Sequence, residues 1–228
     1  GCQSSTRGLF GGGHPNETNL IDFVTIASTG NATEFGNLTL ARSGLSAGSN
    51  ATRGIFAGGS LQPANTGSNT IDYITMATTG NAIDFGDAAY LVEGAVGFSN
   101  QTRGVHAFGF QRTDWAVKNS LQYTTIATTG STVDSGIDGI AAQRNTDAGF
   151  SSPTRGIWAG GSGNLNTITY LTISTIGVNS DFGDLVSDNG GQTSGTSNAV
   201  RGIVFAGNKA PAGGAVNTIE YITIATLG

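Results

Sequence analysis

One short segment near the middle of the chain carries the side chains best suited to binding a ligand. Residues 111–115 contain an amide, a guanidinium, a carboxylate and an indole between two apolar runs. An indole ring can stack on a sugar ring, and the polar groups can hydrogen-bond its hydroxyls. His14 and Gln62 occupy the corresponding segments of two other repeats. We therefore expect a ligand-binding set made of Gln111, Arg112, Asp114, Trp115, His14 and Gln62. The alternative for Trp115 is that it only packs its loop onto the fold.

The acidic residues and histidines do not form a catalytic or metal-binding pattern. A glycosidase needs two carboxylates in different surroundings. Here several acids recur at equivalent repeat positions, as Asp22 and Asp72 do. The others are scattered: Glu17, Glu93, Asp114, Asp147 and Asp188. His14 and His106 lie in different segments, which gives neither a triad nor a zinc spacing. We expect no enzyme, no metal and no cofactor, with a glycoside hydrolase as the third-ranked function.

Two charged motifs recur in nearly every repeat. Asp-Phe-Gly occurs at Asp84 and Asp181, and it lacks the loop pattern of a calcium site. One arginine recurs at the same position of every repeat, mostly within Thr-Arg-Gly; these five of the eight arginines are Arg7, Arg53, Arg103, Arg155 and Arg201. A ring of cations could bind a polyanion. Because the motif recurs throughout, however, we expect a structural role in which each arginine pairs with a repeated acid. The acid is otherwise expected to be a turn residue.

The composition indicates strands joined by tight turns. The 228 residues include 37 glycines but only 4 prolines, and 11% are charged. Apolar residues show no helical periodicity, and the apolar runs are short, rich in Ile, Val, Thr and Tyr, and bounded by Gly and Asn. In the run Ile71 to Met76 both faces are apolar, so both must be covered. We expect an all-β fold with essentially no helix.

The chain consists of five copies of one repeat of about fifty residues. Successive repeat arginines are 46, 50, 52 and 46 residues apart. Each repeat has four strand-sized segments: a Gly/Ser-rich stretch (a), the run after Thr-Arg-Gly (b), the Tyr run (c) and the segment around Asp-Phe-Gly (d). Four strands covered on both faces predict a blade of a β-propeller. We expect one five-bladed domain over residues 1–228, with repeats at about 1–43, 44–93, 94–143, 144–190 and 191–228.

The fifth repeat lacks segment d, because the sequence reaches Thr226-Leu227-Gly228 directly after the Tyr run. Either the last blade has three strands, or this is a segment of a longer repeat array. At the other end, Cys2 aligns with Phe98 and Phe150 of sibling repeats. We therefore expect Cys2 to be a small buried apolar side chain and not a lipid anchor.

The repeat resembles the kelch repeat. Ala41-Arg42-Ser43-Gly44, the Gly58-Gly59 that ends an apolar strand, and Tyr73 follow the kelch order. The chain departs from it in the outer aromatic, since Phe85 lies twelve residues past Tyr73, whereas kelch repeats place a Trp about six past it. The sequence of the repeat, as in Arg53-Gly54-Ile55-Phe56-Ala57-Gly58-Gly59, is also similar to repeats in virion and tail-fibre proteins of marine bacteriophages. This resemblance implies a viral protein, located in a virion or extracellularly.

In an up-and-down blade the b–c and d–a connections lie at one end. The b–c segments differ between repeats, and variable loops on a repetitive scaffold are a common place for binding specificity. We expect a non-catalytic recognition or adhesion module that binds cell-surface carbohydrate. The alternative is a purely structural propeller that contacts other virion proteins or forms a homo-oligomer. The net charge of −5 and the lack of long apolar runs argue against nucleic acid and membrane as partners.

Overall fold

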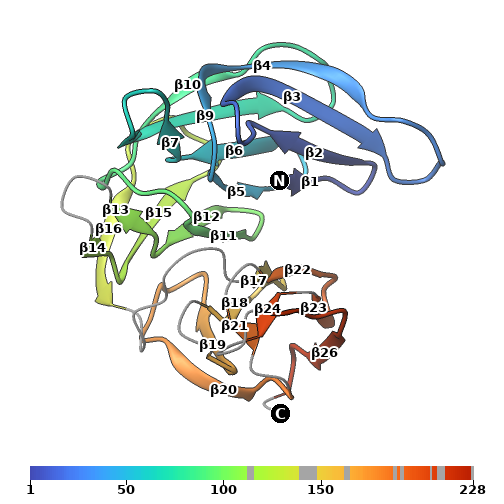
Figure 1. Cartoon of the computed structure of the whole chain (residues 1–228), viewed down its shortest axis with the longest axis vertical. Coiled ribbons are helices and arrows are strands. Elements are labelled where there is room, and N and C mark those ends of the chain that lie inside the picture. Colours follow the sequence, from blue (N-terminus) through green and yellow to red (C-terminus); the bar gives the residue numbers. More distant parts are fainter. Residues whose placement is uncertain are drawn as a thin grey trace.

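A computed structural model describes residues 1–111, 116–138, 148–161, 165–186, 189–190, 193–205, 207–209 and 214–226. The protein is all-β, and the described residues contain no helix. Five antiparallel sheets stand around a common axis as the blades of a five-bladed β-propeller (Figure 1). Among the described residues no helix is present that could cross a bilayer. The all-β, five-bladed prediction is confirmed.

The first four blades have four strands each and the fifth has three among its described residues. Blade 1 comprises β1 (Cys2–Gln3), β2 (Arg7–Gly11), β3 (Thr18–Thr25) and β4 (Thr33–Arg42). Blade 2 comprises β5 (Ser46–Ser49), β6 (Arg53–Ala57), β9 (Thr70–Thr75) and β10 (Ile83–Asp87). Blade 3 comprises β11 (Val96–Ser99), β12 (Arg103–Ala107), β15 (Ser120–Thr125) and β16 (Val133–Asp138). Blade 4 comprises β17 (Ala148–Ser151), β18 (Arg155–Ala159), β19 (Thr167–Thr172) and β20 (Ser180–Asp184). Blade 5 comprises β22 (Ser194–Ser197), β23 (Arg201–Phe205) and β26 (Ile219–Thr223).

Each blade has two apolar faces because side chains alternate along a strand. We call the face toward the following blade the leading face and the face toward the preceding blade the trailing face. In β2, Leu9 lies on the leading face and Phe10 on the trailing face. One buried cluster joins the leading face of blade 1 to the trailing face of blade 2 through Leu9, Ile21, Phe35, Phe56, Ile74 and Met76. Corresponding clusters join blades 2 and 3, 3 and 4, and 4 and 5.

The innermost strands meet along the axis and are tied together by serine hydroxyls. Ser49 Oγ donates to the carbonyl of Gln3, and Ser99 Oγ to that of Ser49, each at 2.7 Å. Ser151 and Ser197 repeat the contact to the blade before, also at 2.7 Å. A serine fits here because its short hydroxyl reaches the backbone of the neighbouring strand. This inner serine ladder runs from blade 1 to blade 5.

Large side chains on the inner strands need a glycine opposite them. Phe98 lies over Gly156, where an added Cβ would come within 2.0 Å of the ring, and Phe150 lies over Gly202 in the same way. Cys2 is half-buried in the blade 1–2 cluster, near Gly54, as expected of a small apolar side chain. The glycine of Thr-Arg-Gly therefore makes room for the preceding blade's inner strand.

Candidate functional site

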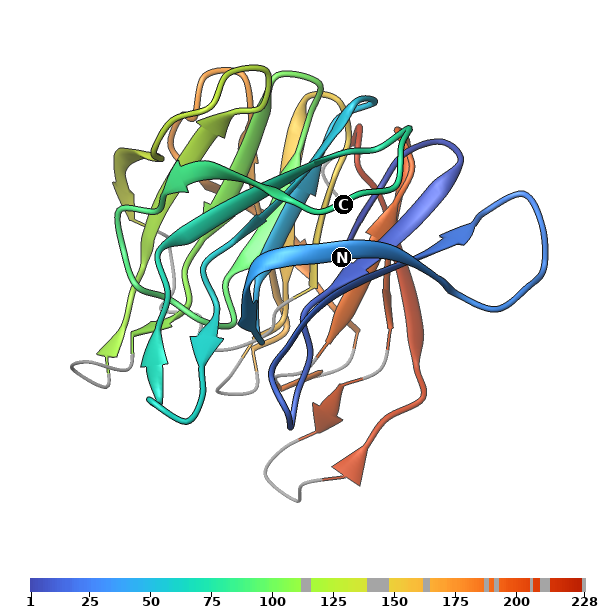
Figure 2. The ribbon, with the colours of Figure 1, turned by 90° about the horizontal axis from the view of Figure 1, so that it is seen from above.

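The loops between the second and third strands of the blades emerge together at one end of the ring. Three of them extend into small hairpins: β7 (Ser60–Leu61) with β8 (Thr66–Gly67), β13 (Phe110–Gln111) with β14 (Ala116–Val117), and β24 (Asn208–Lys209) with β25 (Gly214–Ala215). These hairpins lie at the lower side of the molecule in Figure 2. We call this end the loop end.

The hairpins at the loop end are held by the chain that enters their own blade. Ser43 bridges to Ser60, and Glu93 bridges to Phe110, each through paired backbone hydrogen bonds. In blade 5 the strand β21 (Asn189–Gly190) pairs with β24 in the same manner. The loops are thus anchored at their bases by main-chain pairing. A fixed base allows side chains at the tips to differ without disturbing the blades.

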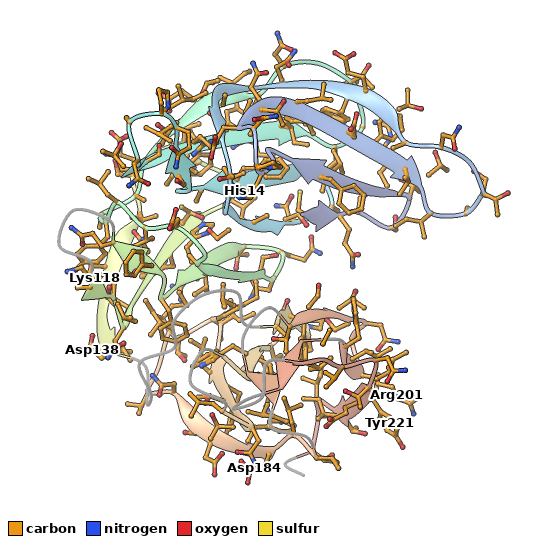
Figure 3. All side chains as sticks on the ribbon, viewed as in Figure 1. His14, Lys118, Asp138, Asp184, Arg201 and Tyr221 are labelled. Atoms are coloured by element: carbon orange, nitrogen blue, oxygen red, sulfur yellow. The ribbon has the colours of Figure 1, made fainter. Side chains whose placement is uncertain are left out.

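The predicted ligand-binding residues that can be placed all lie at the loop end. His14 and Gln62 are exposed, and the Gln62 amide donates to Asn65 Oδ1 at 3.3 Å. Gln111 is half-buried in β13, opposite Ala116. Arg112, Asp114 and Trp115 lie outside the described residues. The placed residues come from three successive blades, and Figure 3 shows His14 at a different part of the ring from the blade-3 hairpin around Lys118. They do not share one pocket.

A central channel was not among the sites expected from the sequence. It has a volume of about 610 Å³ and is lined by inner-strand residues of all five blades. Its wall is mostly glycine, serine and main chain, and the hydroxyls of Ser49, Ser99, Ser151 and Ser197 are already engaged in the inner serine ladder. The four ladder hydroxyls are thus committed to the fold, which leaves fewer donors in this wall for specific recognition. We therefore place the candidate binding surface at the loop end and not in the channel.

None of the repeated arginines pairs with an acid in the described part of the chain, so the expected arginine–acid pairing was wrong there. Each guanidinium lies over the aromatic ring of the third strand in its own blade, between 4.6 and 5.0 Å from the ring centroid. The same group donates to main-chain carbonyls of the next blade: Arg7 to Met76, Arg53 to Ile126 and Ala127, and Arg155 to Ile224. Arg103 donates likewise to Ile173 and Ser174. Arg7, Arg53, Arg103 and Arg155 are therefore interblade ties, and cation–π contact holds each guanidinium flat on its ring.

The Asp of Asp-Phe-Gly is a turn residue. The carboxylates of Asp84, Asp134 and Asp181 each accept a hydrogen bond from the backbone N–H two residues later, at 3.0–3.2 Å. Among the described residues the arginine–acid ion pair that forms is between Arg42 and Asp72, neither of which belongs to the repeated motifs. No group of three His, Cys, Asp or Glu side chains that could hold a metal is found in the described part of the chain.

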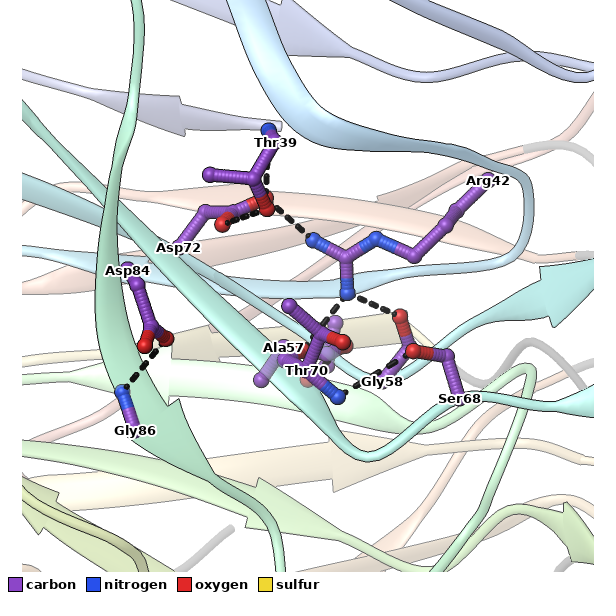
Figure 4. A network of polar contacts seen from close by, with 10 residues as sticks. Thr39, Arg42, Ala57, Gly58, Ser68, Thr70, Asp72, Asp84 and Gly86 are labelled. Atoms are coloured by element: carbon purple, nitrogen blue, oxygen red, sulfur yellow. Dashed lines mark hydrogen bonds and ion pairs between the residues drawn. The ribbon is translucent and has the colours of Figure 1, made fainter.

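Arg42 and Asp72 form a fully buried pair between blades 1 and 2 (Figure 4). Arg42 Nη2 lies 2.6 Å from Asp72 Oδ2, and Nη1 donates to the carbonyls of Gly58 and Thr70. Thr39 donates to the same carboxylate through its backbone N–H and its hydroxyl. Burial lowers the pKa of Arg42, and the charge of Asp72 opposes that change. Among the described residues the pair occurs at one junction, so it leaves no repeated pattern in the sequence.

His106 is the described histidine that the fold buries. Its Nδ1 lies 2.8 Å from Ser46 Oγ, and burial lowers its pKa from 6.5 to about 4. The equivalent position holds Phe56 in blade 2 and Trp158 in blade 4, so His106 fills an aromatic position of the core. A neutral, enclosed imidazole of this kind is not available to a ligand at the loop end.

Neither a protein-family model nor a curated protein matches this chain.

Proposed function

We propose that the protein is a non-catalytic recognition module that binds cell-surface carbohydrate through the loop end. The observation that carries the proposal is the contrast between the two ends of the blades. At the loop end, hairpins of different length and composition stand on bases fixed by main-chain pairing. At the other end, the Thr-Arg-Gly and Thr-Gly turns repeat nearly unchanged.

Composition at the loop end supports a sugar ligand. Exposed amide and imidazole groups at Gln62 and His14 can donate to and accept from hydroxyls, and the sequence adds Trp115 as a stacking ring. Sites spread over several blades suit repeated, weak contacts with a glycan coat, whose combined affinity comes from multivalency. We further propose a place on a virion appendage or another extracellular surface, as the resemblance described in the sequence analysis implies.

A glycan array followed by titration of the best ligand tests this function. The variants are Trp115→Ala and Gln62→Ala, with Thr78→Ala as the matched control, because Thr78 is an exposed residue of a turn outside the loop end. We expect loss of about tenfold or more in affinity for Trp115→Ala, a smaller loss for Gln62→Ala, and none for Thr78→Ala. Circular dichroism confirms that each variant is folded. Absence of glycan binding, or binding that survives every loop substitution, would show that the loop end is not a carbohydrate site.

A further inference from the structure

Five blades make four interblade interfaces in this structure, and two apolar faces are left uncovered. The first is the leading face of blade 5. Ile219 is 75% exposed, whereas the residues at its position in the other blades are 1% exposed or less (Ile21, Ile71, Leu121 and Ile168). Tyr221 is 66% exposed and lies beside Arg201 on the outer side of blade 5 (Figure 3). This face carries the apolar residues that are buried in every other blade.

The second uncovered face is the trailing face of blade 1. Ile26 is 53% exposed and Phe10 is 58% exposed. Their equivalents on the trailing faces of blades 2 to 5 are buried: Met76, Ile126, Ile173 and Ile224 for the first position, and Phe56, His106, Trp158 and Val204 for the second. Figure 1 shows the two faces on either side of the break between the first and last blades. We call the pair of faces the seam.

Among the described residues, two polar side chains at the seam lack the interblade hydrogen bonds that their equivalents make in other blades. The Arg201 guanidinium stacks on Tyr221, but no described main-chain carbonyl accepts from it, unlike the other four repeat arginines. Asp22 stands where Asp72 receives hydrogen bonds from the blade before it, and no described group donates to Asp22. An arginine and a carboxylate preset for interblade bonds indicate that each face is built to be covered by a blade.

The two faces of the seam do not fit each other. Phe205 stands where the other leading faces have Gly11, Ala57, Ala107 or Ala159. Space at this position is tight, since a Cβ on Gly11 would lie 3.0 Å from the Phe56 ring of blade 2. Direct contact between blades 5 and 1 would set Phe205 against Phe10, the equivalent of Phe56. Overpacking of this kind disfavours closure of the ring on itself and head-to-tail contact with a second copy.

The inner serine ladder also argues against direct contact between blades 5 and 1. In blades 2 to 5 a serine hydroxyl donates to the carbonyl of the blade before. Blade 1 has Gln3 at this position, so it lacks the residue that would tie it to Ser197 of blade 5. Along the chain, each outer strand leads into the inner strand of the next blade on the leading side. The same connection would place a following repeat against blade 5.

We propose that the seam is the docking site for one further four-stranded blade of this same repeat, which lies between blade 5 and blade 1 and contacts both. The proposal is independent of carbohydrate binding. The repeat chemistry defines the partner. Its trailing face has a small residue opposite Phe205, and its leading face has Gly or Ala opposite Phe10. Its inner strand has a serine, and its backbone offers a carbonyl to Arg201 and an N–H to Asp22.

Thiol labelling of probe cysteines tests the proposal. The probes are Phe10→Cys on blade 1, Ile219→Cys on blade 5, and Ile83→Cys as the control, because Ile83 lies on the outer strand of blade 2 and is exposed to the same 58% as Phe10. Every variant also carries Cys2→Ala, so that the half-buried native thiol does not contribute to the labelling. Each probe is placed in the 228-residue chain and in a chain extended after Gly228 by a copy of residues 81–138, which supplies an outer strand and one blade. The copy carries His106→Ala to keep the position opposite Phe205 small.

In the 228-residue chain we expect all three probes to label at similar rates in a monomer. In the extended chain we expect the labelling rates of Phe10→Cys and Ile219→Cys to fall by about tenfold or more. The labelling rate of Ile83→Cys should stay unchanged. A copy that keeps His106 is expected to protect both probes less. Slow labelling of both seam probes in the 228-residue chain overturns the proposal: in a monomer it would mean closure on itself, and in a dimer a second copy as the occupant. Protection of Ile219→Cys without Phe10→Cys in the extended chain also overturns it, since the added blade would not bridge the seam.

Discussion

Removal of the Asp72 carboxylate should destabilise the protein more than any single change in a repeated residue. Asp72 accepts three hydrogen bonds from Arg42 and Thr39, and both members of the ion pair are fully buried. In Asp72→Ala the guanidinium keeps two main-chain acceptors but loses its counter-charge. Breaking a buried pair in this way costs about 3–5 kcal/mol. Since a domain has roughly 5–15 kcal/mol in total, the loss is a large share of the free energy of unfolding.

The chain itself supplies the matched control. At the junction of blades 2 and 3, Val92 occupies the position of Arg42, and Gln122 occupies that of Asp72. The Gln122 side-chain oxygen accepts hydrogen bonds from the Ala89 N–H and the Thr132 hydroxyl, and no ion pair is formed. The double variant Arg42→Val/Asp72→Gln therefore takes both side chains from an existing junction, and Thr39 remains as a donor to the new amide oxygen. We expect it to lose about 1–2 kcal/mol, far less than the sum of the two single changes, because neither charge is left alone.

Urea unfolding followed by far-ultraviolet circular dichroism gives the free energies, and hydrogen exchange of β9 reports the blade 1–2 junction directly. The local measurement is needed because an array of blades can unfold in more than one step. The reasoning is refuted if Asp72→Ala costs less than about 1 kcal/mol, or if the double variant loses as much as the two single variants together.

Three further outcomes follow from the interblade contacts. Burial lowers the pKa of His106 from 6.5 to about 4, so between these values the unfolded chain binds a proton that the folded chain excludes. The contribution of His106 to stability is therefore full above about pH 6.5 and falls by about 3 kcal/mol by pH 4. Thermal melts should show this loss in the native chain and not in His106→Phe. Arg53→Ala removes a cation–π contact and two interblade hydrogen bonds and should cost about 2–3 kcal/mol, whereas Arg201→Ala, which removes only the stacking, should cost less than about 1 kcal/mol in urea unfolding. Gly156→Ala pushes a Cβ to 2.0 Å from a ring and should lower the melting temperature by several degrees, while Gly8→Ala, whose nearest neighbour is 3.5 Å away, should leave it nearly unchanged; equal effects would contradict the assignment of the blade faces.

The sequence was sufficient to predict the propeller because every repeat carries the same strand and turn signals. Strand alternation also correctly indicated a run with two buried faces at Ile71 to Met76. The function of the arginines was not predictable from charge alone, because their partners are main-chain carbonyls and aromatic rings. A signal was present nonetheless: the aromatic of the third strand recurs as regularly as the arginine that lies over it.

The candidate site was predictable only in outline. The repeat order placed His14, Gln62 and Gln111 at one end of the ring, and the structure agrees. The pairing of Arg42 with Asp72 was hidden, because among the described residues this ion pair forms at one junction, and a contact that does not recur leaves no pattern in the sequence. The mismatch of Phe205 and Phe10 likewise becomes visible only when the two faces are known.

The inner serine ladder has a consequence for how such proteins change over time. Each serine hydroxyl of the ladder donates its hydrogen bond to the blade directly before its own and not to a more distant blade. A duplication or deletion of one whole repeat therefore leaves every remaining junction chemically intact, and only the one new junction that it creates must adapt. Gene rearrangement in whole-repeat steps can thus vary the number of loops displayed while the scaffold keeps its construction, whereas a shift of even a few residues would break the ladder at once.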